Sequence, residues 1–489
     1  MVWTSGSLIV LLLVILLLQF LKLYWISRRL PPGPKPMPVI GNLWTLNFTF
    51  HHDRLIELAK VYGSIFTLWM GQTPVIVLNG YTAVKEALVT NYDTFSGRPA
   101  TPYIKKYASE KGVIVSNGNT WKQQRRFSLL TLRNLGLGKK SLENQIKDEA
   151  LHLVNVFASH EGHPLNPTTA LSHSIYTVTA GMVFGHHFLT EDKVFQKLNE
   201  AIVAVINFNG TPWGRLYDAI PSLMNHLPGP HQKVFEHLQF LRSHIEQEIR
   251  NHRENLSVEP QDFMDYYLVQ MSKAKGDPTS TFDDNNMMQV VTDFFVAGTE
   301  TMITTLRWAL LYMVAFPEVQ EKVQQELDAV IGSLQKIQYE DYQKLPYTNA
   351  VIHEVQRYSN IVSVGLVRQC VRSANIQGFH IEKGAIILPN LTSVLHDPTH
   401  WETPKMFNPG HFLDKEGNFI KKDAFIPFSI GHRACAGKHL AKMELFIFFT
   451  SILQAFTLRL PKGVKEASFD YTFGTTLQLL PYQICAHPR

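Results

Sequence analysis

Cys435 lies in a ten-residue segment whose residue types could bind a metal. The segment reads FSIGHRACAG, and an apolar stretch with helical spacing, GKHLAKMELFIFFTSILQAF, begins at its last residue. A cysteine at the start of a helix is favoured as a thiolate, because backbone N–H groups and the helix dipole stabilise negative charge there. The thiolate is the form that binds metals. A cysteine considered alone is more often an inert buried thiol, so its neighbours decide between the two interpretations.

A second group of residues lies in a long helical run from Asp284 to Ala315, in the string VAGTET. Gly298 costs about 1 kcal/mol relative to alanine inside a helix, so we expect it to let the helix lie close to a bulky ligand. Thr301 follows Ala297 by four residues. Its hydroxyl is therefore predicted to donate a hydrogen bond to the Ala297 carbonyl and to open a local groove.

A third group is the pair Glu354 and Arg357, which a spacing of three residues places on one face of a helix. With the preceding His353, the string HEVQR comes close to the zinc motif His-Glu-x-x-His. The last position is arginine instead of histidine, so a zinc protease is excluded.

These segments resemble the cytochrome P450 superfamily, and the resemblance covers essentially the whole chain. It implies a mainly α fold with small β-sheets, and a haem b (iron protoporphyrin IX) whose iron is bound by Cys435. A thiolate ligand pushes electron density to the iron and favours O–O cleavage. The residues that match the family's haem-binding pattern are Phe428, Gly431, Arg433, Cys435 and Gly437.

The resemblance also implies roles for other residues. The string VAGTET matches the family's oxygen-binding helix, so Thr301 with water, and Glu300, would deliver protons during oxygen activation. Gly431 and Gly437 would allow the chain to approach the flat porphyrin closely. The haem propionates would be bound by guanidinium groups and an indole N–H, which belong to Arg433, Trp121, Arg125, Arg98 and Arg368.

Glu354 and Arg357 match the family's Glu-x-x-Arg pair, and His411 in the string FNPGHF occupies the position of the third partner. Many relatives have arginine there, and this departure resembles microsomal family-2 members. We expect the three residues to form a structural triad that locks the cysteine loop behind the haem.

Substrate choice is expected to depend on residues at the family's substrate-recognition positions, which are Ile114, Phe294, Ala297, Val362, Leu366 and Thr476. Almost all of them are apolar, so a lipophilic substrate is predicted. The segments TLRNLGLGKKSLE and PYTNAVIHEVQR resemble the vertebrate J-type enzymes of family 2, which oxidise arachidonic and other polyunsaturated fatty acids. The resemblance therefore implies hydroxylation or epoxidation of such fatty acids, alongside xenobiotics. O₂ would be the co-substrate, and electrons would come from NADPH through cytochrome P450 reductase, with cytochrome b5 as a second donor.

Two other functions stay open. A haem-thiolate isomerase or dehydratase would rearrange peroxides without a reductase, although the intact Glu300–Thr301 pair argues against it. A non-catalytic haem carrier or gas sensor would tolerate Thr301→Ala, whereas a monooxygenase would release peroxide. No Cys-x-x-Cys-His string occurs, which excludes a c-type electron carrier.

The composition limits the class of protein. The 489 residues are 45% hydrophobic and carry a formal net charge of +5, which is far too little for a nucleic-acid binder. Only three widely spaced cysteines occur, so no disulfide framework or zinc cluster is expected, and a reducing compartment fits.

The first 29 residues are predicted to be a signal anchor with flanking basic residues. From Leu8 to Ile26 only Gln19 and Lys22 are polar, and this run would span roughly 28 Å as a helix, close to the thickness of a bilayer. A cleaved signal peptide is the alternative, but no small-x-small cleavage site follows. Arg28 and Arg29 then favour a single-pass protein of the endoplasmic reticulum with a cytosolic body. The sequons at Asn47, Asn209, Asn255 and Asn390 would carry no glycan.

The rest of the chain is predicted to form a hinge and one catalytic domain. Residues 30–42 contain five prolines and favour a stiff extended spacer. Residues 43–489 show no clean linker, so a single domain is expected. Within it, residues 62–80 predict two strands around a turn, and IQGFHIEKGAIILPN predicts a hairpin that turns at Glu-Lys-Gly.

Overall fold

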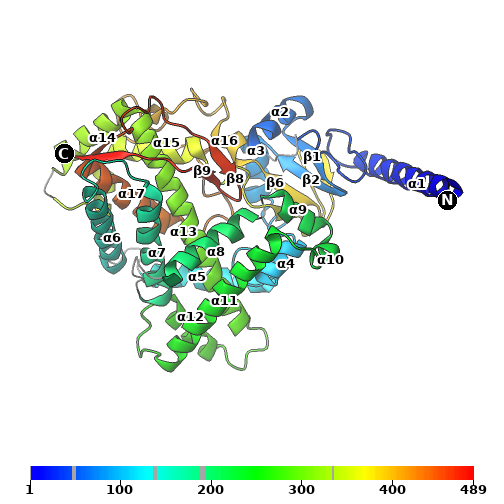
Figure 1. The fold of residues 1–489 in the computed structure, drawn as a ribbon, viewed down its shortest axis with the longest axis horizontal. Coiled ribbons are helices and arrows are strands. Elements are labelled where there is room, and N and C mark those ends of the chain that lie inside the picture. Colours follow the sequence, from blue (N-terminus) through cyan, green and yellow to red (C-terminus); the bar gives the residue numbers. More distant parts are fainter. Residues whose placement is uncertain (1, 47–50, 136–139, 187–192, 209, 333–334) are drawn as a thin grey trace. The chain divides into compact units, whose positions relative to one another are not determined.

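The computed structural model describes residues 2–46, 51–135, 140–186, 193–208, 210–332 and 335–489, and its secondary structure is mainly helical with four small sheets (Figure 1). The chain divides into two compact units that alternate along the sequence. The sheet unit comprises Met1–Pro99, Val362–His400 and Ile426–Ala434, and the helical unit comprises Ala100–Ile361, Trp401–Phe425 and Cys435–Arg489. The single catalytic domain expected for residues 43–489 stays a prediction.

The sheet unit is built on a four-stranded sheet of order β1-β2-β6-β3. β1 (Ile65–Met70) and β2 (Thr73–Leu78) pair antiparallel, as the sequence predicts for residues 62–80. β2 pairs parallel with β6 (Ile386–Pro389), which pairs antiparallel with β3 (Arg368–Gln369). Alternate apolar side chains of β1 and β2 pack against α2 (His52–Tyr62), because successive residues of a strand face opposite sides. The unit also contains α3 (Gly80–Lys85), a π-helix (Glu86–Thr90) and α16 (Leu391–Leu395).

The predicted hairpin at Glu382–Gly384 is wrong. The strands that pair are β4 (Ala374–Ile376) and β5 (Phe379–Ile381), around Gln377 and Gly378. Both turn residues have positive φ angles, 46° and 84°, which matches the twist that a two-residue hairpin needs. Beyond the Glu-Lys-Gly turn, β6 joins the larger sheet instead.

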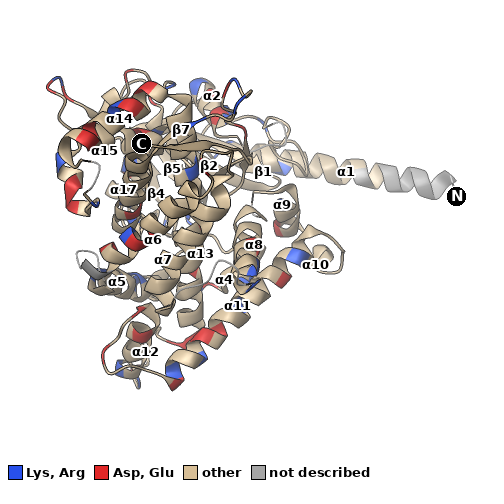
Figure 2. Cartoon of the chain, turned by 60° about the vertical axis from the view of Figure 1, so that its left-hand side comes forward, with Lys and Arg blue, Asp and Glu red and all other residues tan. Residues whose placement is uncertain are grey.

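The helical unit surrounds α13 (Asp284–Ala315), which begins and ends at the residues that the sequence predicts. Nearly every residue of α13 from Asn286 onward is buried, because α7, α17, α11 and α15 pack around it. Charged residues of both signs lie instead on helices such as α11 and α14 (Figure 2). The other helices of this unit are α4 (Pro102–Ala108), α5 (Gly118–Leu135), α6 (Lys140–Ala158), α7 (Pro167–Phe184), α8 (Lys193–Phe208), α9 (Pro212–Ala219), α10 (Pro221–Met224), α11 (Pro230–Glu254), α12 (Phe263–Lys273), α14 (Pro317–Val330), α15 (Pro346–Ser359) and α17 (Lys438–Ala455).

Two small sheets complete the helical unit. β7 (Phe456–Arg459) pairs antiparallel with β10 (Cys485–Pro488), and β8 (Tyr471–Phe473) pairs antiparallel with β9 (Leu477–Leu479). Two short 3₁₀ helices, Tyr339–Lys344 and Pro409–Phe412, lie in the connections. The β8–β9 hairpin packs on α13, so it can place side chains beside the buried face of that helix.

The amino-terminal segment forms α1 (Val2–Ser27) over the predicted apolar run. Within the described part of the chain, none of the helices combines the length and the apolar character that crossing a bilayer requires. The proline-rich residues 30–42 form no helix and take part only in isolated bridges, such as that between Met37 and Gly41.

Candidate functional site

Cys435 stands three residues before the first residue of α17, and Gly437 is the N-cap of that helix. Burial raises the pKa of the Cys435 thiol, although N–H groups of Gly437 and Lys438 and the charge of Arg125 act to lower it. The helix terminus therefore favours the thiolate as expected, but it does not outweigh burial. A bound metal cation would outweigh the effect of burial, because coordination deprotonates a thiol. Cys435 still has exposed surface, so a ligand can reach it.

The two glycines of the cysteine segment have different roles. Gly431 has a φ of +76°, and a Cβ there would lie 1.8 Å from the carbonyl oxygen of Leu88, so the fold itself requires glycine. A Cβ on Gly437 would meet no described atom within 4 Å. Open space therefore lies two residues from Cys435, which fits the close approach of a flat group.

Three of the predicted propionate ligands cluster in the sheet unit. Burial lowers the pKa of Arg98, and the positive charges of Arg368 and Arg433 lower it further. Arg98 Nη1 donates to the carbonyl oxygens of Leu366 at 2.9 Å and Val367 at 2.6 Å. Like charges held this close favour a bound anion, and guanidinium groups suit carboxylates. Phe428, in the same unit, is partly buried.

The other two predicted propionate ligands lie one turn apart on α5. Trp121 is buried, and burial lowers the pKa of Arg125 while the charge of Cys435 opposes that change. Arg125 is therefore close enough to Cys435 to interact with it electrostatically within the helical unit.

The predicted bond of Thr301 is confirmed. Its Oγ1 donates to the Ala297 carbonyl oxygen at 2.7 Å, and Thr305 repeats the pattern by donating to the Thr301 carbonyl oxygen at 2.7 Å. A Cβ on Gly298 would lie 3.4 Å from Thr179 of α7, which is an ordinary van der Waals distance, so packing against α7 does not require glycine there. That Gly298 lets α13 lie close to a bulky ligand stays a prediction.

Glu300 is buried and points toward the β8–β9 hairpin. Its Oε1 accepts hydrogen bonds from Thr304 Oγ1 at 2.8 Å and from Gln478 Nε2 at 2.5 Å. Burial raises the pKa of Glu300, although these bonds and the charge of Arg307 act in the opposite direction. The raised pKa means that this carboxyl group keeps its proton to higher pH than an exposed one does.

Asp293 is a functional candidate that the sequence motifs missed. It lies in the buried part of α13 and accepts hydrogen bonds from the backbone N–H groups of Val113 at 2.7 Å and Ile114 at 3.0 Å. Gln289 Nε2 donates to its other oxygen at 2.9 Å. Asp293 therefore fixes the segment that carries Ile114. The signal available in the sequence was an acidic residue in an otherwise apolar helical run.

The free energy of unfolding of the wild-type protein is expected to fall as pH rises, and Asp293→Asn is expected to remove that fall. Burial raises the pKa of Asp293 from 3.8 to about 6, so the folded chain binds this proton more tightly than the unfolded chain does. The resulting stabilisation is complete below pH ~4 and is lost as pH rises through 6, by about 3 kcal/mol. Urea unfolding of both proteins between pH 4 and 7 measures it. A pH-independent difference between them would contradict the assignment.

The structure brings Glu354, Arg357 and His411 into contact. The Arg357 guanidinium donates two bonds of 2.7 Å to the Glu354 carboxylate, and neither side chain is exposed. The N–H of Thr403 donates to His411 Nε2 at 3.1 Å, so the ring proton lies on Nδ1, which is 3.2 Å from Glu354. Arg357 also donates to the carbonyl oxygens of Pro404 and Met406, which ties the segment after Trp401 to α15.

The predicted substrate-contacting residues are distributed over both units. Ile114 and Thr476 both lie beside α13. The N–H of Ile114 donates to Asp293, and Thr476 Oγ1 lies 3.5 Å from Glu300 Oε1. Phe294 packs on Phe263 of α12 with ring centroids 5.0 Å apart, and Ala297 is half-buried. Val362 and Leu366 belong to the sheet unit, where Leu366 is exposed. That these residues line one cavity stays a prediction.

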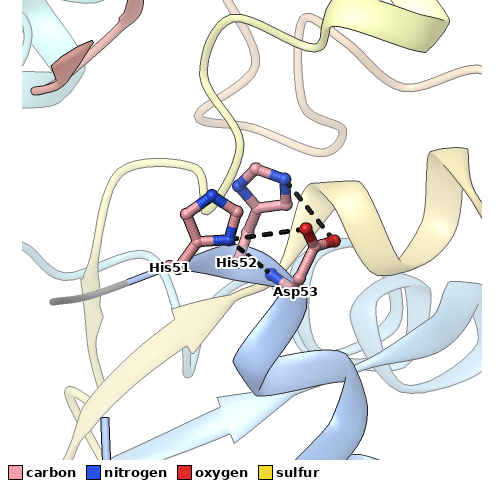
Figure 3. Close-up of side chains that lie close together, drawn as sticks. All are labelled: His51, His52 and Asp53. Carbon is pink, nitrogen blue, oxygen red and sulfur yellow. Dashed lines mark hydrogen bonds and ion pairs between the residues drawn. The ribbon is translucent and has the colours of Figure 1, made fainter. Parts of the chain in front are cut away.

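Among the described residues, two groups of histidines and acids are spaced closely enough to hold a metal ion. In His51, His52 and Asp53 (Figure 3), the two rings stack with centroids 4.5 Å apart and planes 24° apart, so their in-plane lone pairs do not converge. His51 instead caps α2 by accepting the N–H of Asp53. Burial alone would lower the pKa of His252, but hydrogen bonds to Asp262 and the Glu248 carbonyl raise it to about 9. At neutral pH a metal ion would therefore have to displace a ring proton that is held in the hydrogen bond to Asp262 at 3.0 Å.

The family model for cytochrome P450 matches residues 31–486. Cytochrome P450 2J5 of Mus musculus and cytochrome P450 2J2 of Homo sapiens are each 42% identical to this chain over 463 residues, which is 94% of this chain and 92% of each relative. Cytochrome P450 2C8 of Homo sapiens is 41% identical over 463 residues, 94% of both chains. The chain therefore belongs to the cytochrome P450 family. It is a haem-thiolate monooxygenase that acts on lipophilic substrates.

In each of the two units, taken by itself, the described residues have the chemistry that the haem of this family requires. The helical unit supplies a reachable thiol with an open space beside Gly437, and the sheet unit supplies a cluster of three guanidinium groups. A thiolate suits iron, and the guanidinium groups suit the two propionates.

Proposed function

We propose that this monooxygenase uses NADPH, through a membrane-bound flavoprotein reductase, to hydroxylate or epoxidise polyunsaturated fatty acids such as arachidonic acid, and xenobiotics. The proposal is carried by the 42% identity to cytochrome P450 2J2 over 94% of the chain, together with the segments TLRNLGLGKKSLE and PYTNAVIHEVQR, whose resemblance to the J-type enzymes implies such fatty acids. In each turnover one atom of O₂ enters the substrate. The other atom leaves as water, and two electrons and two protons are consumed.

We propose that Cys435 would bind the haem iron through its sulfur, which the N–H groups of Gly437 and Lys438 orient. Haem, when bound, supplies the redox and oxygen chemistry. Arg98, Arg368 and Arg433 would hold propionates from the sheet unit, and Trp121 and Arg125 would do so from the helical unit.

The proton path is assigned to α13. Burial raises the pKa of Glu300, so its carboxyl group keeps a proton to higher pH than an exposed carboxyl group would. Thr301 would pass protons on with water, since its hydroxyl can rotate away from the Ala297 carbonyl oxygen to donate elsewhere. Glu354, Arg357 and His411 would hold the cysteine segment in place without taking part in the reaction.

A basic surface is proposed to dock the reductase, with cytochrome b5 as a second partner. Burial lowers the pKa of His353, and the charges of Lys442, Lys438 and Lys421 lower it further, to about 3. Three lysines therefore lie near one another in the helical unit and suit an acidic partner.

We also propose that residues 1–29 anchor the protein in the endoplasmic reticulum with a cytosolic body. The support is the apolar run from Leu8 to Ile26 and the basic residues after it. The sequon at Asn390 has a fully buried side chain that donates to Asn79 at 2.9 Å, whereas Asn255 ends α11 at the surface. Asn47 and Asn209 lie outside the described residues. N-glycan on Asn255 in cells would contradict this topology.

Purified enzyme reconstituted with the reductase is expected to convert arachidonic acid to hydroxy or epoxy products only when NADPH and O₂ are present. Mass spectrometry of the products against a panel of lipids and drug-like amines measures this. Unchanged arachidonate with oxidised amines would contradict the fatty-acid assignment. Product without NADPH would indicate the isomerase, and no product from any substrate would indicate a haem carrier.

A further inference from the structure

The side chain of Gln478 connects three elements of the helical unit. Its Nε2 donates to Glu300 Oε1 at 2.5 Å, and its Oε1 accepts from Asn207 Nδ2 at 2.8 Å. Gln478 lies in β9, Glu300 in α13 and Asn207 near the end of α8. A primary amide donates and accepts at once, so it can join a carboxylate to another amide.

The β8–β9 hairpin is held on α13 by contacts that do not involve the Gln478 side chain. Trp308 Nε1 donates to the Leu477 carbonyl oxygen at 2.8 Å, and Arg307 Nη2 donates to the Leu480 carbonyl oxygen at 3.0 Å. Replacing the Gln478 side chain should therefore leave the hairpin in place. Any effect on the reaction can then be separated from unfolding.

Helix α8 approaches the turn of this hairpin closely. Thr475 Oγ1 donates to the Ile206 carbonyl oxygen at 2.7 Å, and a Cβ on Gly474 would lie 2.4 Å from Asn207 Oδ1. The next residue, Thr476, is one that we expect to contact substrate. A substrate that shifts this turn or α8 would therefore change the geometry around Gln478.

The groups that face Glu300 come from three elements. Arg307 and Thr304 belong to α13 itself, Gln478 and Thr476 to the hairpin, and Tyr176 to α7, where the charge of Glu300 adds to the effect of burial in raising the tyrosine pKa. Burial favours the neutral acid, whereas the bond from Gln478 favours the carboxylate. Gln478 thus influences both where Glu300 lies and how readily it gives up its proton.

We propose that Gln478 is a positioning residue that holds Glu300 for proton delivery and, through Asn207, ties that placement to the position of α8. The inference rests on the proposed role of Glu300 as the proton carrier. With the chain of hydrogen bonds intact, the two electrons and two protons of each turnover yield oxygenated substrate and water. With the chain broken, the same two electrons and two protons convert O₂ to hydrogen peroxide, and the substrate is unchanged.

The test compares Gln478→Leu with Asn207→Leu in the reconstituted holoenzyme, by measuring product and peroxide per NADPH across pH. Gln478→Leu is expected to lower product per NADPH by up to about tenfold, because a typical hydrogen bond within a protein is worth about that factor at most. It should also raise the pH midpoint of coupling, which is the pH at which product per NADPH is half its maximum. The reason is that a hydrogen bond that lowers the pKa of Glu300 is lost. Asn207→Leu keeps that bond, so it should reduce coupling without moving the midpoint. Haem content and thermal midpoint should match wild type in both.

The double variant Glu300→Gln/Gln478→Leu decides whether Gln478 acts through Glu300. The proposal expects it to couple no worse than Glu300→Gln alone, and a further tenfold loss would overturn it. Full coupling in Glu300→Gln would refute the proton-carrier role itself. If Glu300→Gln uncouples the enzyme while Gln478→Leu keeps wild-type coupling and midpoint, this inference alone fails.

Discussion

Replacing Cys435 with alanine is expected to abolish oxidation and to remove the reduced carbon monoxide spectrum typical of a thiolate-ligated haem. Cys435 is the one cysteine that combines exposed surface with hydrogen bonds from a helix terminus among the residues that the structure describes. Loss of an outer-shell partner alone costs a metal site about 10–100-fold, so loss of the ligand should cost at least about 100-fold in product formation. Product analysis and the carbon monoxide difference spectrum measure the two effects.

Two further replacements make this prediction specific. Cys370 and Cys485 are buried free cysteines, and Cys370 Sγ donates to the Arg372 carbonyl oxygen at 2.9 Å. Cys485→Ala removes a thiol from a buried position in β10 and should keep the spectrum. Cys435→His can retain iron through a nitrogen ligand, so a folded, haem-loaded variant without oxidation would separate ligation from folding. An unchanged spectrum in Cys435→Ala would refute the assignment of the thiolate.

Features that depend on short spacing were predictable from the sequence. The ends of α13, the bond from Thr301 to the Ala297 carbonyl and the Glu354–Arg357 pair each involve residues within one helix. Helical geometry fixes which neighbours three or four residues apart can meet, so the residue types determine the contact. Motif spacing therefore predicts which residues of α13 share one face.

Contacts between distant segments were not predictable in this way. Gln478 and Glu300 are 178 residues apart, and Asp293 accepts the N–H of Val113 from 180 residues away. Nothing in the spacing along the chain requires these pairs to meet, because the fold of the intervening chain decides it. The same limit applies to Gly298, because nothing in the spacing along the chain places Thr179 of α7 beside it. Residue type indicated an unusual position, but not its neighbour.

Replacing Glu354 with glutamine is expected to destabilise the folded protein by about 3–5 kcal/mol, since it leaves a buried guanidinium without its counter-charge. Glu354 and Arg357 are both fully buried, and the carboxylate also accepts the backbone N–H of Asn408 at 2.7 Å. Glutamine has one acceptor oxygen in place of two, so it cannot satisfy the guanidinium and the N–H together. Urea unfolding and the rate of haem loss measure the effect, and haem should be lost first if the triad holds the cysteine segment.

Glu402→Gln is the matched control, because the same chemical change is made in the same region of the helical unit. Glu402 is 71% exposed and pairs with Lys422 at 3.1 Å. An exposed ion pair is worth at most about 1 kcal/mol, so Glu402→Gln should unfold close to wild type and retain haem. Both variants remove one carboxylate, so a difference in their stability reflects the burial of Glu354 and not the change in net charge. If the two variants lost the same stability, the triad would be no more than a surface network, and the haem would have to be retained by other contacts.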